Sequence, residues 1–499
     1  DTENRWVQLS ALMPWEELEE TYAPQFSPTV GAPAKPVRLA FGALFIKQRL
    51  GLTDEEIVHQ IRENAYIQFF LGFAGYSNKA PFDPSMMVHF RKRFSDDDLK
   101  RINELVVQRG KEMLLEAIVD DSDVDDSDGQ GPGSGDQLSL DDLVKPPDWP
   151  EGKNWGTLSI DASCTPADIT YPTDLKLLNE ARETTDRIID DLCRQSRSFG
   201  GHRHRYDRGK ARAHFLNVAK QKKPRRRKLK AAVRRQLSYL QRNLEAIDAL
   251  IAAGARLSAL KAHWWQKLLA CSELHRQQTI LINSDTRSIP HRLVNLVQRH
   301  VRPIVRGKAR TAVEFGAKIS VSVQNGFPFL HRISWDAYNE GEDLIAQAEK
   351  YKQDNGCYPE RICADRIYIN TKNRHYCKRK GIRLSGKRLG RPPKDPQINA
   401  AQKQQLSADQ RRRNEVEGVF GSGKRKYSLK LIMARLIHGA ETSISMAFLV
   451  MCAEKILRLL RLFFVLISAW LNSLLRDCGP WARSLNLLVS DASNLAVLT

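Results

Sequence analysis

The sequence predicts an α/β protein, α+β in the broader sense, with an all-α region in front of the mixed part. Three observations lead to this class. Helical patterns fill residues 36–94, strand patterns alternate with helical ones from residue 157 onward, and a stretch with neither pattern separates the two parts. Strands that alternate with helices are typical of a sheet covered by helices. The 499 residues are enough for two or three domains.

Short helices with tight joints are expected between residues 36 and 94. Pro36 suits the first turn of a helix that runs to Leu50. Thr53 and Glu56 form the pattern of a capping box in front of the next helix. We therefore expect residues 1–118 to form a helical amino-terminal domain.

The last of these helices, MMVHFRKRF at 86–94, follows the capping residues Asp83 or Ser85 and carries Arg91, Lys92 and Arg93. A basic helix at the end of a short helical series is typical of a helix-turn-helix DNA-binding module. Any small helical bundle has a similar pattern, so a folding or pairing module is the alternative.

Residues 119–156 are expected to be a linker. Six Asp residues lie between 120 and 128, and GQGPGSG and PPDWPEG follow. Such composition is typical of an inter-domain tether. The Asp run lacks the Gly and the Glu that a calcium-binding loop needs at its sixth and twelfth positions, so we do not interpret it as a calcium site.

After the linker, TLSIDAS (157–163) predicts a short strand that ends in a carboxylate, Asp161. A long helical insertion is expected from about 174 to 302. Its middle carries a heptad seam, and residues 257–299 can supply the helices that return to the sheet. The seam consists of Leu237, Leu240, Leu244, Ile247 and Ile251.

Strand patterns resume at AKISVSV (317–323), and the Asn325-Gly326 pair before FPFLHRISW predicts a hairpin. A helix over 342–353 then leads to a short strand, RICAD (361–365), which ends in Asp365. A helix over TKNRHYCKRKG and a loop at GRPPK (390–394) follow, and a capping box at Ser407 and Gln410 is expected to open the helix with Glu417.

The charge of the chain indicates a polyanionic partner. There are 78 Lys and Arg residues against 58 Asp and Glu, a net charge of +20, although a basic enzyme without nucleic acid has the same balance. The eight Cys residues show no zinc spacing, which favours a reduced, cytoplasmic protein. The longest uncharged apolar stretch, 462–475, has 14 residues and is too short to span a membrane.

Three carboxylates form the candidate catalytic set: Asp161 and Asp365, each at the end of a strand, and Glu417 on a helix. Hard divalent cations prefer oxygen ligands, and two Mg²⁺ ions held by three carboxylates can activate a water or a 3′-hydroxyl against a phosphodiester. For each residue alone, a solvated or helix-capping carboxylate is the more common role.

Arg413 precedes Glu417 by one helical turn, and Lys424 follows it by two turns. Spacings of 4 and 7 place the three side chains on one stripe if the helix continues through GSG at 421–423. Cations on both sides of a metal-binding carboxylate can hold a phosphate backbone. A surface Arg–Glu pair is the alternative.

The order of strand Asp, helical insertion, hairpin, strand Asp and helix Glu resembles the RNase H-like DDE transposases of bacterial insertion sequences, in the broad grouping of insertion-sequence families four and five. Their last helix bears an R-x3-E-x6-K pattern, which RNEVEGVFGSGK (413–424) reproduces. Further phrases look like family text: PFDPSMMVHFRKRF (81–94), DASCTPADITYPTDLKLLNEAR (161–182), RPIVRGKA (302–309), EFGAKISVSV (314–323), ISWDAYNEGEDL (333–344) and RLSGKRLGRPPK (383–394).

The resemblance implies an RNase H-like DDE catalytic domain over 157–460 with the insertion at 174–302, and a helical carboxy-terminal extension over 461–499. It implies that Asp161, Asp365 and Glu417 bind two Mg²⁺ or Mn²⁺ ions, with Arg413 and Lys424 on the DNA. One departure is Gln410, where the family has Tyr. The partners implied are double-stranded DNA, at element ends and target, and a second copy of the chain in a homodimer, with no membrane.

The leading hypothesis is a bacterial, nucleoid-associated transposase that cleaves the ends of its element and joins the 3′-hydroxyl to target DNA. A domesticated, non-catalytic DNA-binding protein and an RNase H-like nuclease without strand transfer are the alternatives. The insertion contains a basic run, KQKKPRRRKLK at 220–230. A solvated loop is the simpler interpretation of this run, but its place beside a heptad helix favours DNA contacts by Arg225, Arg226, Arg227 and Lys228.

Overall fold

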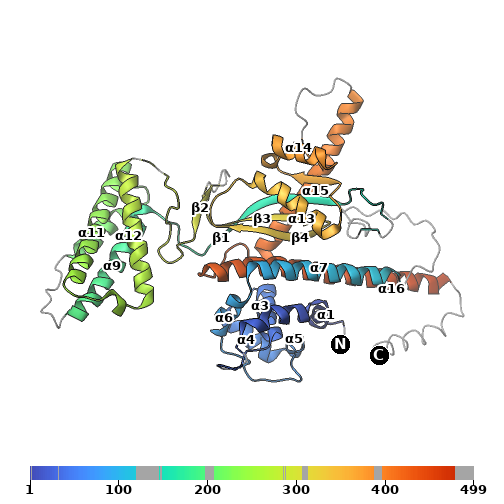
Figure 1. The fold of residues 1–499 in the computed structure, drawn as a ribbon, viewed down its shortest axis with the longest axis horizontal. Coiled ribbons are helices and arrows are strands. Elements are labelled where there is room, and N and C mark those ends of the chain that lie inside the picture. Colours follow the sequence, from blue (N-terminus) through green and yellow to red (C-terminus); the bar gives the residue numbers. More distant parts are fainter. Residues whose placement is uncertain are drawn as a thin grey trace.

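The computed structural model describes residues 1–119, 145–196, 207–305, 313–386 and 396–477, apart from positions 2, 28, 32, 147, 148, 285 and 287. Most of the predicted linker and the GRPPK segment lie outside these residues. No helix among the described residues has the length and apolar character needed to cross a membrane. The mixed α/β class with a helical amino-terminal region is confirmed (Figure 1).

The amino-terminal region consists of helices, as predicted. Thr53 and Glu56 form the expected capping box at the start of α4, and Gly51 ends α3 with a left-handed φ of 68°. Ser85 is the N-cap of α6, but its side chain makes no capping hydrogen bond. The helices are α1 (Arg5–Leu12), α2 (Trp15–Tyr22), α3 (Val37–Leu50), α4 (Asp54–Glu63), α5 (Ala65–Phe70), α6 (Met86–Arg93) and α7 (Asp96–Val119).

A six-stranded sheet forms the centre of the mixed part. Its order is β2-β3-β1-β5-β6, and β4 pairs with the part of β3 that β2 leaves free. β1 is antiparallel to β3 and parallel to β5, and β6 is parallel to β5. The strands are β1 (Thr157–Pro166), β2 (Arg302–Val305), β3 (Val313–Gln324), β4 (Phe327–Ser334), β5 (Arg361–Ala364) and β6 (Arg383–Leu384).

The predicted hairpin is confirmed between β3 and β4. Asn325 and Gly326 have φ values of 50° and 84°, and two consecutive positive φ values are what a tight two-residue hairpin turn requires. The first strand is longer than expected, since its pairing with β3 continues to Pro166. Asp161 therefore lies in the middle of β1, and the prediction that it ends the strand is wrong.

Helices cover both faces of the sheet. Leu158 and Ile160 of β1 pack with α13 (Asp343–Asn355) and α14 (Thr371–Arg379). On the other face, Ile319 and Val321 of β3 belong to the same core as α16 (Ile437–Asp477). The helix with Glu417 is α15 (Pro396–Lys426), which packs on β1 and β5.

The prediction that Ser407 opens the Glu417 helix is wrong, because α15 begins at Pro396. Proline suits the first turn of a helix, and the Ala, Gln and Lys residues that follow are strong helix formers. These residues extend the helix in front of Ser407. The Gly residues at 421–423 do not interrupt it, and at Gly423 an added Cβ would lie 2.7 Å from the Leu429 side chain.

The insertion after β1 is a helical bundle that lies to one side of the sheet (Figure 1). Leu240 and Ile247 of the heptad seam are buried, with Leu237, Leu244 and Ile251 packed beside them. Only one long helix returns to the sheet, and the described part of 284–301 contains no helix, so the prediction of several returning helices is wrong. The helices are α9 (Asp174–Ser196), α10 (Arg208–Ala219), α11 (Arg226–Ala252) and α12 (Ala262–Asn283).

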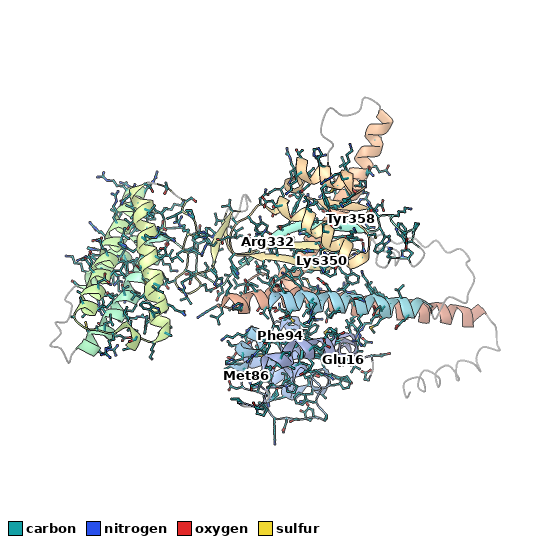
Figure 2. The ribbon with its side chains drawn as sticks, viewed as in Figure 1. Glu16, Met86, Phe94, Arg332, Lys350 and Tyr358 are labelled. Carbon is teal, nitrogen blue, oxygen red and sulfur yellow. The ribbon has the colours of Figure 1, made fainter. Side chains whose placement is uncertain are left out.

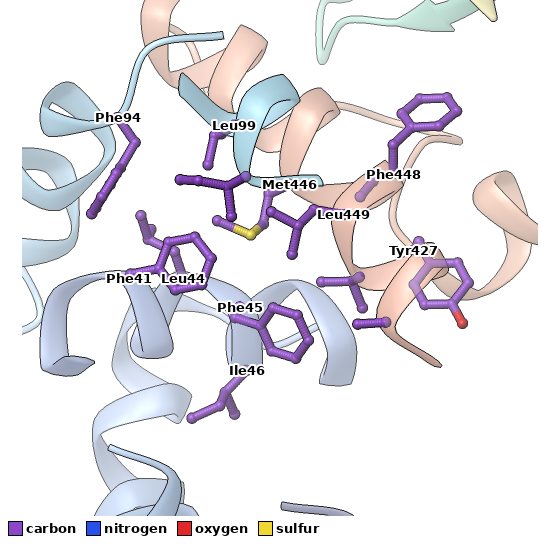
Figure 3. Close-up of a cluster of buried hydrophobic side chains, with 14 of the residues drawn as sticks. Phe41, Leu44, Phe45, Ile46, Phe94, Leu99, Tyr427, Met446, Phe448 and Leu449 are labelled. Carbon is purple, nitrogen blue, oxygen red and sulfur yellow. The ribbon is translucent and has the colours of Figure 1, made fainter. Parts of the chain in front are cut away.

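The amino-terminal helices share a hydrophobic core with α16. Phe41, Phe45 and Phe94 meet Met446 and Leu449 in this core (Figure 3). The long helices α7 and α16 pack side by side between the amino-terminal helices and the sheet (Figure 1). The amino-terminal region is therefore packed against the mixed part by direct contacts.

An ion pair between α13 and α7 also joins the amino-terminal region to the mixed part. Lys350 of α13 pairs with Glu104 of α7 at 2.8 Å, and Figure 2 shows Lys350 above α7. The predicted domain boundaries remain predictions.

Candidate active site

A cavity of about 760 Å³ opens beside β1, and all three predicted carboxylates line it. Asp161 comes from the sheet, Asp365 from the loop after β5, and Glu417 from α15. The parallel pairing of β1 with β5 ends at Ile160 and Ala364, so the next residue of each strand is one of the carboxylates. The structure thus brings together three residues that are far apart in the sequence.

Asp161 is the most buried of the three. Its carboxylate accepts a hydrogen bond from the Ala162 amide at 2.8 Å. Burial raises its pKa to about 6, and the nearby Glu340 and Asp365 carboxylates add to the shift, while the Ala162 amide and Arg413 oppose it. Desolvation of this kind disfavours the ionised form, and a bound cation would offset it.

Asp365 and Glu417 are about half exposed, and Arg413 lies between them. Its guanidinium donates to Asp365 Oδ1 at 3.2 Å and to Glu417 Oε1 at 3.0 Å. The predicted contact between Arg413 and Glu417, one helical turn apart, is present. Arg413 is therefore an internal counter-ion of two of the three carboxylates.

Lys424 lines the same cavity two turns further along α15, together with Phe420 and Gly421. The helix stripe predicted for Arg413, Glu417 and Lys424 therefore faces one cavity. Gln410, at the position where the family has Tyr, is exposed and its amide lies 3.4 Å from Asn414 Oδ1.

Sequence reasoning missed a second charged pair in the cavity. Lys318 of β3 binds Glu340 Oε2 at 3.1 Å and donates to the Tyr338 carbonyl at 3.0 Å. Both charged side chains are mostly buried. The sequence did contain a signal for Lys318. It is the charged residue in AKISVSV, a strand pattern of apolar and small residues, and a lysine in a central strand needs a partner.

The donor set fits a hard divalent cation. Carboxylate oxygens are the ligands that Mg²⁺ and Mn²⁺ prefer, and Asp161 is a buried carboxylate whose desolvation a metal would compensate. Among the described residues, no three His, Cys, Asp or Glu side chains already form a metal-binding group.

The predicted DNA contacts on α6 differ in their availability. Arg91 makes a bidentate ion pair with Asp54 at 2.9 and 2.6 Å, which joins α6 to α4. Arg93 lies over the Phe26 ring and donates to the Gln25 carbonyl. Lys92 is exposed.

The predicted DNA contacts in the insertion are exposed side chains at the start of α11. This start lies beside the start of α9, the helix that follows β1 in the chain, because Ala232 of α11 packs with Leu175. The basic residues are Arg225, Arg226, Arg227 and Lys228.

Comparisons with known proteins identify two regions of the chain. Residues 362–454 match a family model described as transposase DDE domain, and residues 1–93 match one described as transposase domain. Both of these regions are therefore similar to transposase domains. The first match contains Asp365, Arg413, Glu417 and Lys424, and the second covers α1 to α6. The resemblance to DDE transposases is therefore confirmed.

One curated relative is an uncharacterized protein, ORF8 in the nfe locus of Rhizobium meliloti, which is 36% identical over 102 residues. The match covers 20% of this chain and 49% of the relative, so it spans about half of that protein's length. No solved structure matches the chain significantly. Neither transposase match reaches Asp161 or the insertion, and these parts of the site rest on the geometry alone.

Proposed function

We propose that the chain is a DNA transposase that binds the ends of an insertion sequence, cleaves the DNA and joins the 3′-hydroxyl to target DNA by metal-dependent phosphoryl transfer. The observation that carries the proposal is the single cavity lined by Asp161, Asp365 and Glu417, two of which lie in the transposase DDE match. The remaining cavity residues suit the same chemistry, because Lys424 and Arg413 can bind phosphate oxygens.

An RNase H-like fold is part of the proposal. Its support is the sheet order β2-β3-β1-β5-β6, with antiparallel strands on one side of β1 and parallel strands on the other. The first acidic residue lies on the central strand and the second follows its parallel neighbour. This topology gives the two carboxylates a fixed separation.

Asp161, Asp365 and Glu417 would hold two Mg²⁺ or Mn²⁺ ions. Bound there, such ions neutralise charge on the attacking and leaving oxygens of a phosphodiester. The protein's own contribution is to hold the three carboxylates on a strand, a turn and a helix that pack together. With cations on these carboxylates, the Arg413 guanidinium would be available to bind a DNA phosphate.

Further DNA contacts are assigned to Arg91, Lys92 and Arg93 on α6 and to the four basic residues 225–228 at the start of α11. The exposed positions of Lys92 and of 225–228 support this assignment. Arg91 and Arg93 would have to leave their present partners, Asp54 and Phe26. We also propose a homodimer on DNA at the bacterial nucleoid, since the pairing of two element ends calls for two active sites.

The test is cleavage and joining on the DNA that flanks the source element, with a pre-cut end and a target plasmid. Glu417→Gln, Asp161→Asn and Asp365→Asn should each abolish joining and leave DNA binding largely intact. Glu415→Gln is the matched control, because Glu415 lies one half-turn away on α15 and pairs with Arg412. Full joining activity in Glu417→Gln would contradict the proposal.

The same assay separates the alternatives. Cleavage of the flanking DNA without joining of the pre-cut end would indicate a nuclease. DNA binding with neither reaction, in the wild-type chain with Mg²⁺ or Mn²⁺, would indicate a non-catalytic DNA-binding protein.

A further inference from the structure

A second hollow lies outside the carboxylate cavity. It is a groove of about 520 Å³ between the insertion and the start of α16. Helix α12 and the segment 291–302 that follows form one wall, and Arg435, Leu436 and Ile437 form the other. No site predicted from the sequence includes these residues.

The groove is positively charged. Arg299 and Arg435 are exposed, and neither forms an ion pair with any described residue. Glu273 is the acidic residue that lines the groove, and Arg276 already neutralises it at 2.6 Å. Arg302 adds a further positive charge, which it shares with Asp336 at 3.5 Å.

Both walls are tied to the segment that follows Asp161 on β1. The buried Gln298 donates to the Asp168 carbonyl at 2.9 Å. On the other side, Ile432 donates to the Pro166 carbonyl at 2.8 Å and accepts from the Asp168 amide at 3.1 Å. The position of the groove relative to Asp161 is therefore set by hydrogen bonds to the backbone of Pro166 and Asp168.

The first wall also has a preset shape. His291 has a left-handed φ of 51°, which is uncommon for a residue with a side chain. Gln277 of α12 holds this turn, since its side chain accepts from the Leu293 amide at 2.9 Å and donates to the His291 carbonyl at 3.3 Å. The wall is thus fixed by side-chain hydrogen bonds.

Strand β2 connects the groove to the carboxylate cavity. Arg302 at its start lines the groove, and Ile304 and Val305 at its end line the cavity. Three residues of a strand span about 10 Å at about 3.3 Å each. This length corresponds to about three base-pair steps of B-DNA at about 3.4 Å each.

We propose that this groove binds the phosphate backbone of the duplex DNA that continues from the carboxylate cavity. The inference rests on the proposed function and adds a location for the flanking duplex. Arg299 and Arg435 contact phosphates, and the exposed side chains of Val297 and Leu436 lie against the deoxyribose. Contacts to phosphates carry no sequence information, so the binding assigned to Arg299 and Arg435 is independent of sequence.

The experiment measures DNA binding by the full chain at several salt concentrations, with duplexes of element-end and random sequence. Arg299→Ala/Arg435→Ala should weaken binding to both duplexes and reduce the slope of log affinity against log salt by about 2, at about 0.9 per phosphate contact. The charge-retaining Arg299→Lys/Arg435→Lys should keep most of the slope.

Lys372→Ala/Arg379→Ala is the matched control. It removes the same number of exposed charges from α14, which lies beside β6 at the opposite edge of the sheet from β2. This control should have the wild-type slope.

A wild-type slope in Arg299→Ala/Arg435→Ala, while the wild-type chain binds DNA, would overturn the groove assignment and leave the proposed function standing. No salt-dependent DNA binding by the wild-type chain would instead contradict the proposed function itself. If the double Ala variant does not fold, Arg299→Gln alone gives the same test, with an expected slope change of about 1.

Discussion

At the scale of single residues, Arg413 pairs with the carboxylates of Asp365 and Glu417. Under the proposed function, its guanidinium would compete with a divalent cation for the same oxygens and would repel that cation. Each of these partly exposed pairs is worth about 0.2–1 kcal/mol. The net effect on metal affinity is therefore expected to be several-fold.

We predict that Arg413→Gln binds Mn²⁺ about threefold to tenfold more tightly than the wild-type chain in the absence of DNA, corresponding to about 1 kcal/mol. Titration calorimetry with Mn²⁺ measures this affinity directly. Arg412→Gln is the control, because Arg412 pairs with Glu415 outside the cavity. Weaker or equal Mn²⁺ binding by Arg413→Gln would show that the guanidinium does not compete with the metal.

His331 of β4 makes stability depend on pH. Burial lowers its pKa to about 3, and Lys100 of α7 and Lys350 of α13 contribute. In the folded chain the ring is neutral and lies 2.6 Å from Ser322 Oγ. The unfolded chain binds a proton near the ordinary pKa of 6.5, so the free energy of unfolding falls as the pH decreases from about 6.5 toward 3.

His331→Gln keeps a hydrogen-bonding side chain without a titrating group. We predict that lowering the pH from 7 to 5 destabilises the wild-type chain by about 2 kcal/mol more than this variant. The unfolded wild-type chain takes up a proton at His331 over the roughly 1.5 pH units between 6.5 and 5, and the variant has no such group. Urea unfolding at the two pH values measures the difference. An identical pH dependence in both proteins would show that His331 does not titrate on unfolding.

At the scale of elements, the insertion is held in register by a buried polar network between α9 and α11. Arg182 is 2% exposed and binds Asp186 at 2.7 Å. Asn243 of α11 donates to the Asp186 carboxylate at 2.8 Å and to the Thr185 hydroxyl at 2.9 Å. These contacts between buried groups fix how the two helices face each other.

We predict that Arg182→Ala destabilises the insertion by about 3–5 kcal/mol, because it removes the nearer cation, at 2.7 Å, from the buried Asp186 carboxylate and leaves only the longer contact with Arg208 at 3.7 Å among the ion pairs of the described residues. Arg194→Ala is the control on the same helix. It removes an exposed pair with Asp191 and should change stability by less than about 1 kcal/mol. Thermal unfolding of both variants, followed by circular dichroism, compares them; equal effects would remove the assigned role of the network.

The sequence predicts the three candidate carboxylates better than it predicts the strand pairing and the ion pair that surround them. Asp161, Asp365 and Glu417 could be singled out because local patterns mark strands and helix stripes, although the strand end predicted at Asp161 is wrong. The length of β1 could not be predicted, because it depends on pairing with β3, whose residues lie 150 or more positions further along the chain. The same pairing puts Lys318 opposite Cys164 and so beside the cavity. Glu340 reaches the same cavity from a 3₁₀ turn, and no local sequence pattern indicates the position of that turn.

At the scale of the whole molecule, α16 joins regions that the sequence separates by the linker. Thr442 donates to backbone carbonyls of Arg91 and Phe94 at the end of α6. Ile444, Phe448 and Leu449 are buried in the core that they share with α3 and α7. The amino-terminal region is therefore placed by packing and does not depend on the linker for its position.

Cleavage of the linker should accordingly leave the two parts of the chain together. We predict that, with a specific protease site inserted between residues 120 and 144, the cleaved fragments still co-elute in size-exclusion chromatography. Each large apolar side chain buried between them contributes about 1.5–3 kcal/mol, and at least Ile444, Phe448 and Leu449 of α16 are fully buried there. Leu449→Asp should release the amino-terminal fragment after cleavage and have little effect on the uncut chain's elution. Separation of the wild-type fragments on cleavage would mean that the linker, and not α16, positions the basic helix α6 relative to the carboxylate cavity.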